Sequence, residues 1–140
     1  MREVKLGGLL FRVEYRTAEG DQGPAIRVFA MMRGNARQVL RFDCFDNDPH
    51  YHYDPTGVNR KYHLDRLTMG CPIEFSLQQI ALRARPMIVE AGFADAAAGV
   101  DQQELEGRID ELRRVVEFAC ADLPTLDESV DISGQGSLFS

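Results

Sequence analysis

The chain has 140 residues, with 22 acidic and 16 basic side chains and a formal net charge of −6. This length suits one domain with a hydrophobic core, and the acidic balance argues against broad electrostatic binding to DNA or RNA. Three cysteines spaced far apart indicate reduced thiols, and with no signal peptide or apolar run of about 18 residues we expect a cytoplasmic protein without a membrane span.

Alternation of apolar and polar residues predicts an antiparallel β-meander in the first half of the chain. The alternating runs cover residues 4–16, 26–32, 38–45, 50–53 and 60–63. Gly34-Asn35 is a tight-turn dipeptide, and Gly7-Gly8 either splits off a short first strand or marks a bulge. Because the connections are too short for crossovers, we expect four or five antiparallel strands.

A helical period replaces the alternation after Gly70. Ser76 and Gln79 have the spacing of a capping box, and an apolar stripe follows them. We therefore expect a first helix over residues 76–91, kinked or restarted at Pro86.

A second amphipathic helix is predicted over residues 101–122. Strands followed by helices indicate an α+β domain, with the two helices packed on one face of the sheet. We expect this single domain to cover residues 1–124 and residues 125–140 to form a flexible acidic and Gly/Ser-rich tail.

Residues 41–55 are the stretch richest in reactive side chains. Successive strand residues point to opposite faces, so His50 and His52 share one face and Tyr51 and Tyr53 the other. Asp43 lies inside a predicted strand, where aspartate is disfavoured, which makes it the favoured functional carboxylate.

Three interpretations of the histidine pair remain open. The first is a surface pair bonded to nearby aspartates. The second is a metal pair completed by a further ligand, for which a lone His-x-His is a weak signal because zinc needs three or four ligands. The third is a metal-free acid–base site. The further ligand of the second interpretation would come from Asp43, Asp46, Asp48 or His63.

In the third interpretation, Arg41, Tyr51 and Tyr53 position or neutralise a phosphate beside His50 and His52. We expect no cofactor, and a divalent metal on His50, His52 and Asp43 is the open alternative. Cys44 is expected to pack as a small apolar residue, with a nucleophile paired with a histidine as the alternative.

Arg41 and Asp43, then His50-Tyr-His52, then Phe75-Ser76 at the opening of a helix resemble small bacterial families of unknown function. More distantly, the order is similar to the TumE-type toxins of toxin–antitoxin pairs. The resemblance covers residues 39–87, and the chain departs from it by inserting Cys44-Phe45. It implies a metal-independent ribonuclease or phosphodiesterase centred on the two histidines, although the net negative charge disfavours an RNA substrate.

A second resemblance concerns Gln135-Gly-Ser-Leu-Phe139, which is similar to the clamp-binding peptide of bacterial replication and repair proteins. Leu138 and Phe139 would fill a preformed pocket while Gln135 fixes the register, and Ser137 is a further matching position. The alternative is that Leu138 and Phe139 pack against the protein itself. If the peptide docks on a partner, the chain is a non-enzymatic interaction protein whose partner is a sliding clamp or an antitoxin-like protein.

Overall fold

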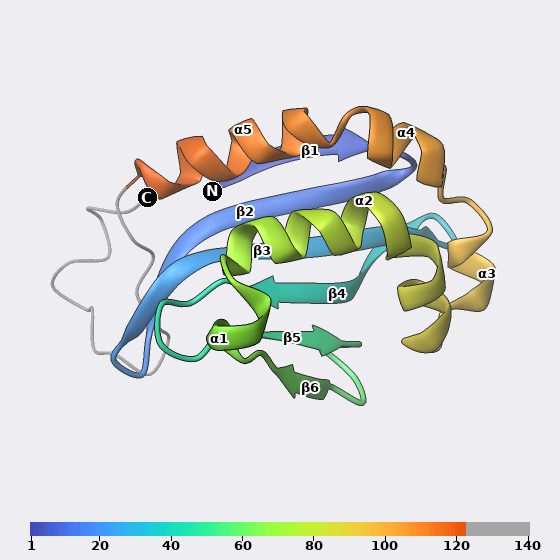
Figure 1. The fold of residues 1–140 in the computed structure, drawn as a ribbon. Helices are drawn as coiled ribbons and strands as arrows, with labels where there is room; N and C mark the ends of the chain where they lie inside the picture. The colour runs from blue at the N-terminus through green and yellow to red at the C-terminus, as the bar shows by residue number, and fades with distance from the viewer. Residues whose placement is uncertain (123–140) are drawn as a thin grey trace, which may run out of the picture.

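The computed structural model describes residues 1–122, and this part of the chain contains a six-stranded antiparallel sheet in which each strand pairs with the next (Figure 1). The strands are β1 (Arg2–Leu6), β2 (Leu9–Ala18), β3 (Asp21–Met32), β4 (Asn35–Asp43), β5 (His50–Tyr53) and β6 (Arg60–His63). The α+β prediction is confirmed, although the sheet has more strands than the four or five expected. The expected boundary near residue 124 lies outside the described residues.

Gly7 and Gly8 produce the additional first strand. Both have positive φ angles, 58° and 82°, and they form the two-residue turn between β1 and β2. A Cβ atom on Gly8 would lie 2.5 Å from the carbonyl oxygen of Gly99, so the turn also packs closely against the segment before α4 (Gln102–Gly107). Arg60–His63 pairs with β5 and completes the sheet.

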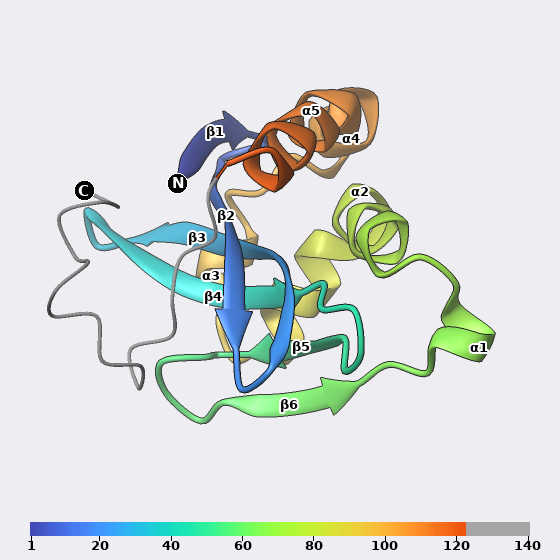
Figure 2. The ribbon, with the colours of Figure 1, turned by 90° about the vertical axis from the view of Figure 1, so that its left-hand side faces the viewer.

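Helices cover one face of this sheet (Figure 2). The other helices are α1 (Arg66–Met69), α2 (Pro72–Glu90), α3 (Ala94–Ala97) and α5 (Ile109–Cys120). The α2 helix packs over β4 and β5, and α5 packs over β1, β2 and β3. The predicted helix over residues 101–122 is divided at Arg108, which has the non-helical angles φ −119° and ψ 17°.

The first predicted helix begins earlier than expected, at Pro72. A proline fits the first helical position because its φ is preset and its missing N–H has no helical partner there. Ser76 is therefore inside α2, and its hydroxyl donates to the carbonyl oxygen of Pro72 at 2.8 Å. The predicted capping box is wrong.

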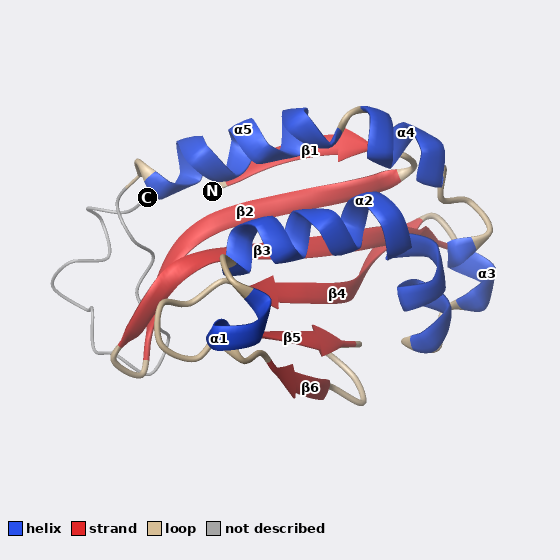
Figure 3. Cartoon of the chain, in the orientation of Figure 1, coloured by secondary structure: helices blue, strands red, loops and turns tan. Residues whose placement is uncertain are grey.

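The α2 helix continues through Pro86, and its ribbon turns in the C-terminal part (Figure 3). Gln102 bridges the disturbed turn. Its Nε2 donates to the carbonyls of Ile80 and Ala81 at 2.9 and 2.6 Å, and its Oε1 accepts from the Arg85 N–H at 2.9 Å. The side-chain amide thus bonds backbone groups in the turn just before Pro86, which itself has no N–H to donate.

The hydrophobic core lies between the helices and the sheet. Its largest buried side chains come from both layers and include Phe11, Ile26, Phe42, Ile80 and Leu112. The opposite face of the sheet carries charged residues, and strand register places them in a row. Arg12, Arg27, Arg41, His52 and Lys61 are successive cross-strand partners from β2 to β6. We call the face with this row the open face.

Candidate functional site

Strands β4 and β5 bring four predicted site residues together on the open face. Asp43 pairs with His50 across the strands, and Arg41 pairs with His52. Directly opposed residues of antiparallel strands project to the same side. Asp43, His50 and His52 are only 2%, 7% and 5% exposed, so the cluster lies in the floor of the sheet surface.

One oxygen of Asp43 serves both imidazoles. The Oδ2 atom lies 2.8 Å from His50 Nε2 and 3.2 Å from His52 Nε2. The two rings are 4.9 Å apart between centroids and nearly perpendicular, at 78°. The ε nitrogens therefore converge on a single carboxylate oxygen.

The other nitrogen of each ring fixes its orientation. His50 Nδ1 lies 2.8 Å from the backbone oxygen of Asp48, and His52 Nδ1 lies 2.7 Å from Asn59 Oδ1. A carbonyl oxygen can only accept, so these δ nitrogens carry protons and donate. Both ε nitrogens then face Asp43 Oδ2.

Two arginines complete the surroundings of Asp43. Arg41 Nε lies 3.1 Å from Asp43 Oδ2, and Arg41 Nη2 lies 3.0 Å from His52 Nε2. Arg16 Nη1 is 3.9 Å from the other oxygen, Oδ1, which is buried without a hydrogen-bond partner among the described residues.

Burial of Asp43 opposes its ionisation, but hydrogen bonds from His50 and His52 and the charge of Arg41 outweigh this effect. The pKa of Asp43 therefore lies well below its usual range. Burial also lowers the pKa of Arg41, which the neighbouring carboxylate of Asp43 only partly offsets. The buried centre is an ionised carboxylate surrounded by basic groups.

The cluster lies at the base of a cleft of about 460 Å³. The tip of the β2–β3 hairpin curves towards β5 and β6 and forms the facing wall (Figure 2). The cations at this cleft are Arg16, Arg41 and Lys61. Arg16 and Asn59 are site residues that sequence reasoning missed, because they reach the site only through strand curvature and a turn.

Asp21, also missed from the sequence, ties the hairpin to the loop that holds His50. Its carboxylate accepts from the backbone N–H groups of Asn47 at 3.0 Å and Asp48 at 2.8 Å. Burial opposes ionisation of Asp21, but these backbone hydrogen bonds lower its pKa. The Asp48 carbonyl is thereby held in place for His50 Nδ1.

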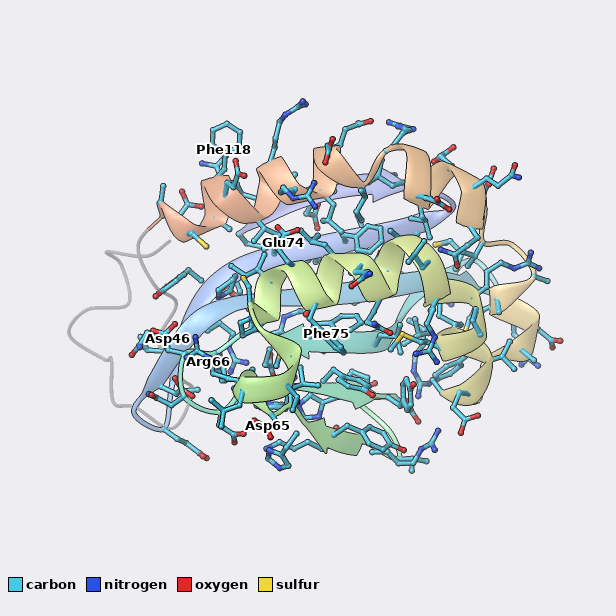
Figure 4. All side chains as sticks on the ribbon, in the orientation of Figure 1. Asp46, Asp65, Arg66, Glu74, Phe75 and Phe118 are labelled. Atoms are coloured by element: carbon cyan, nitrogen blue, oxygen red, sulfur yellow. The ribbon has the colours of Figure 1, made fainter. Side chains whose placement is uncertain are left out.

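The remaining aspartates and His63 lie outside the buried cluster. Asp48 accepts from His63 Nδ1 at 2.8 Å on the exposed surface. Asp46 receives hydrogen bonds from Gln22 and, at its backbone oxygen, from Arg66 at the start of α1 (Figure 4). Among the acidic residues considered as a further ligand, Asp43 is the one whose carboxylate lies beside both histidines.

Tyr51 and Tyr53 are not part of the site, so their predicted supporting role is corrected. Both lie on the helix-covered face, as the alternation itself requires. Tyr51 stacks on Phe42 and Tyr62 at 5.8 and 5.3 Å and contacts Phe75 of α2, which points towards the sheet (Figure 4). They belong to the packing between the sheet and α2.

Cys44 lies on the core side of the chain, with Sγ 3.4 Å from the hydroxyl of Ser76. Burial raises the pKa of its thiol to about 12. The thiolate is the nucleophilic form, so the alternative of a Cys44 nucleophile is wrong.

The fold and the cluster define an α+β domain with a buried His–Asp–His centre in an arginine-lined cleft. The family described as domain of unknown function (DUF7700) matches residues 3–116, so the chain belongs to this family. No curated protein and no solved structure matches the chain. The expected membership of a family of unknown function is confirmed, and the resemblance to TumE-type toxins stays a prediction.

Two expectations concern other parts of the molecule. Gln135, Ser137, Leu138 and Phe139 lie outside the described residues. Among the helices of residues 1–122, none has the length and apolar character needed to cross a bilayer.

Proposed function

We propose that the cleft on the open face binds a phosphodiester, with RNA as the first substrate to test, and hydrolyses it at His50 and His52. The observation that carries the proposal is the convergence of both ε nitrogens on Asp43 beneath Arg16, Arg41 and Lys61. Paired imidazoles suit proton transfer to and from phosphodiester oxygens, and neighbouring cations stabilise the charge on phosphate.

Arg16 and Lys61 are suited to hold the phosphate. The ion pair of Arg16 with Asp43 is long, at 3.9 Å, and Lys61 has no ion pair among residues 1–122. Their donors can therefore turn to an anion in the cleft. The net charge of −6 lowers long-range attraction of a polyanion, and the cleft also carries carboxylates, those of Glu19, Asp21, Asp43 and Asp48. Binding would therefore depend on direct contacts of the phosphate with the three cations.

In the metal-independent version implied by the toxin resemblance, one histidine is the acid and the other the base. We assign the acid role to His50, whose Nε2 lies 2.8 Å from the Asp43 carboxylate. Arg41 Nη2 can only donate and lies 3.0 Å from His52 Nε2, so that nitrogen is an acceptor. His52 is then the base, oriented by Asn59.

The test is growth of a bacterial host expressing the protein, combined with RNA cleavage by the purified protein. We expect the wild type to slow growth and to cleave RNA, and His50→Ala/His52→Ala to lower cleavage by about 100-fold or more. His63→Ala is the matched control, because this exposed histidine lies outside the buried cluster. Equal growth of wild type and double variant, with no cleavage by either, would remove the enzymatic proposal.

A second function is favoured by the sequence Gln135-Gly-Ser-Leu-Phe139. We propose that this segment docks on a bacterial sliding clamp, with an antitoxin-like protein as the competing partner. The test is titration of a peptide of residues 130–140 against purified clamp. Leu138→Ala/Phe139→Ala should weaken binding by about 2 kcal/mol or more, and an unchanged signal would contradict docking through this pair.

A further inference from the structure

We propose that Asp43, His50 and His52 bind a divalent transition metal ion, and that Arg41 is the resident cation which this ion displaces. The inference deepens the proposed phosphodiester site by assigning a cofactor to it, and it rests on that function only for the identity of the substrate. The binding itself follows from the arrangement of the three side chains.

The spacing of the donor atoms fits one ion. The ligand atoms of Asp43, His50 and His52 all lie within 4.8 Å of one another, and the two nitrogens lie 2.8 and 3.2 Å from Asp43 Oδ2. Ligands about 2.1 Å from a metal at angles of 90–109° are separated by about 3.0–3.4 Å. Small movements of the side chains would therefore place an ion among all three.

The hydrogen bonds behind the rings are those that metal-binding histidines use. Each δ nitrogen donates to a carbonyl oxygen, from Asp48 for His50 and from Asn59 for His52. This fixes the tautomer that leaves Nε2 free for a metal. The loop that carries Asp48 is in turn held by Asp21.

A metal-free site leaves hydrogen-bonding groups poorly matched. Asp43 Oδ1 is buried and has no hydrogen-bond partner among the described residues. In addition, both ε nitrogens crowd the single oxygen Oδ2 of Asp43, at 2.8 and 3.2 Å, while Oδ1 receives neither of them. A metal ion held by these three side chains would relieve this crowding.

Two imidazoles and one carboxylate suit zinc, iron or manganese. The cluster lines the cleft, so the remaining coordination positions can face water or substrate. An ion there would polarise a phosphodiester oxygen or lower the pKa of a bound water molecule.

Arg41 is the obstacle to this binding and also its most informative residue. Its Nη2 and Nε lie 3.0 and 3.1 Å from His52 Nε2 and Asp43 Oδ2, so they use the lone pairs that the ion requires. A guanidinium and a metal ion cannot share these atoms. The Arg41 side chain is 21% exposed and lines the cleft, so it can swing out towards an anionic substrate.

The test is calorimetric titration of chelator-treated protein with Zn²⁺ and with Mn²⁺, without substrate. We expect a single bound equivalent, and a decrease in affinity of about 100-fold or more for His52→Ala, because even the loss of an outer partner costs about 10–100-fold. His63→Ala should bind as the wild type does. This control separates the buried cluster from the exposed group of Asp48, His50 and His63.

The direction in which Arg41→Gln changes the metal affinity decides whether Arg41 competes with the ion. If Arg41 competes with the ion, removal of its charge raises the affinity, whereas an arginine that merely supports the cluster would leave it unchanged or lower it. The wild type alone provides a second measurement, because Co²⁺ bound by two imidazoles and a carboxylate gives visible absorption bands that Zn²⁺ abolishes.

Absence of binding to the chelator-treated wild type overturns the inference, and so does binding that survives His52→Ala but is lost in His63→Ala. RNA cleavage in excess chelator would overturn it while leaving the phosphodiester function intact. Metal binding without any RNA cleavage would support the metal site and contradict the phosphodiester function.

Discussion

Asp43 has more ionisable partners than any other described residue, since two imidazoles and two guanidinium groups lie within 4 Å of its carboxylate. Removing one member of a buried ionic network leaves the others without compensation. The cost of losing such a residue therefore exceeds the contribution of any one contact.

We expect Asp43→Ala to lower the free energy of unfolding by about 3–5 kcal/mol, because Arg41 and the histidines stay buried without their anion. Urea denaturation measures this difference. Asp48→Ala is the control, since it breaks an ion pair with His63 whose side chains are 56% and 60% exposed, and it should cost less than about 1 kcal/mol. Similar losses in both variants would contradict the network.

Asp54 gives a pH-dependent prediction. It is buried in the turn after β5, where its carboxylate accepts from the Val58 N–H at 2.9 Å and from Arg37 at 2.8 Å. Burial opposes ionisation, but these hydrogen bonds lower the pKa of Asp54 below its usual value. A lowered folded-state pKa contributes stability above the unfolded-state pKa, near about 3.9, and this stability is lost as pH falls through the folded-state pKa.

Asp54→Asn isolates this charge, because asparagine also tolerates the φ of 51° at this position. We expect a loss of about 1 kcal/mol at pH 7 that shrinks as the pH falls below about 4. Thermal unfolding of both proteins at pH 7 and at a pH below about 4 measures this loss of stability. An equal loss at both would assign the effect to geometry instead of charge.

At the scale of the element, α2 illustrates how a distant side chain repairs a helix. Pro86 disturbs the backbone hydrogen bonds of its turn, and Gln102 satisfies the carbonyls of Ile80 and Ala81 and the N–H of Arg85. The proline and the glutamine should therefore be energetically coupled.

We expect Gln102→Ala to cost about 1–3 kcal/mol in the wild-type chain, because it leaves several backbone groups unsatisfied. In a Pro86→Ala background the helix can close its own hydrogen bonds, so the same substitution should cost clearly less. A double-mutant cycle by denaturant unfolding measures the coupling, and a cost that is the same in both backgrounds would contradict it.

Strand alternation was sufficient to predict the antiparallel meander and to place His50 and His52 on one face, because both depend on local periodicity. The same alternation places Tyr51 on the other face, where it packs against Phe42 and Tyr62. Its predicted role in positioning a phosphate rested on the chemistry of its side chain and not on the strand pattern. Arg16 and Asn59 could not be found in this way. They reach the cluster through the curved β2–β3 hairpin and the turn after β5, which are properties of the assembled sheet.

At the scale of the whole molecule, the three cysteines report on how the core opens. Cys71 and Cys120 are exposed, whereas Cys44 is buried and its pKa is raised to about 12 by that burial. With a thiol-specific reagent at pH 8, we expect Cys71 to react first and Cys44 to react only when the domain unfolds. Mass spectrometry of the labelled peptides measures the order, and rapid labelling of Cys44 in the folded protein would contradict the packing.

The pairing of each strand with the one before it gives the nascent chain a defined order of assembly. A sheet of this kind can add each hairpin as it leaves the ribosome. Asp43, His50 and His52 can come together when β4 meets β5, before α2 has emerged from the ribosome. At that stage the apolar face of the same hairpin, with Phe42 and Tyr51, has no helix to cover it. We expect chaperones to bind the emerging chain during this interval, when Asp43, His50 and His52 are already together.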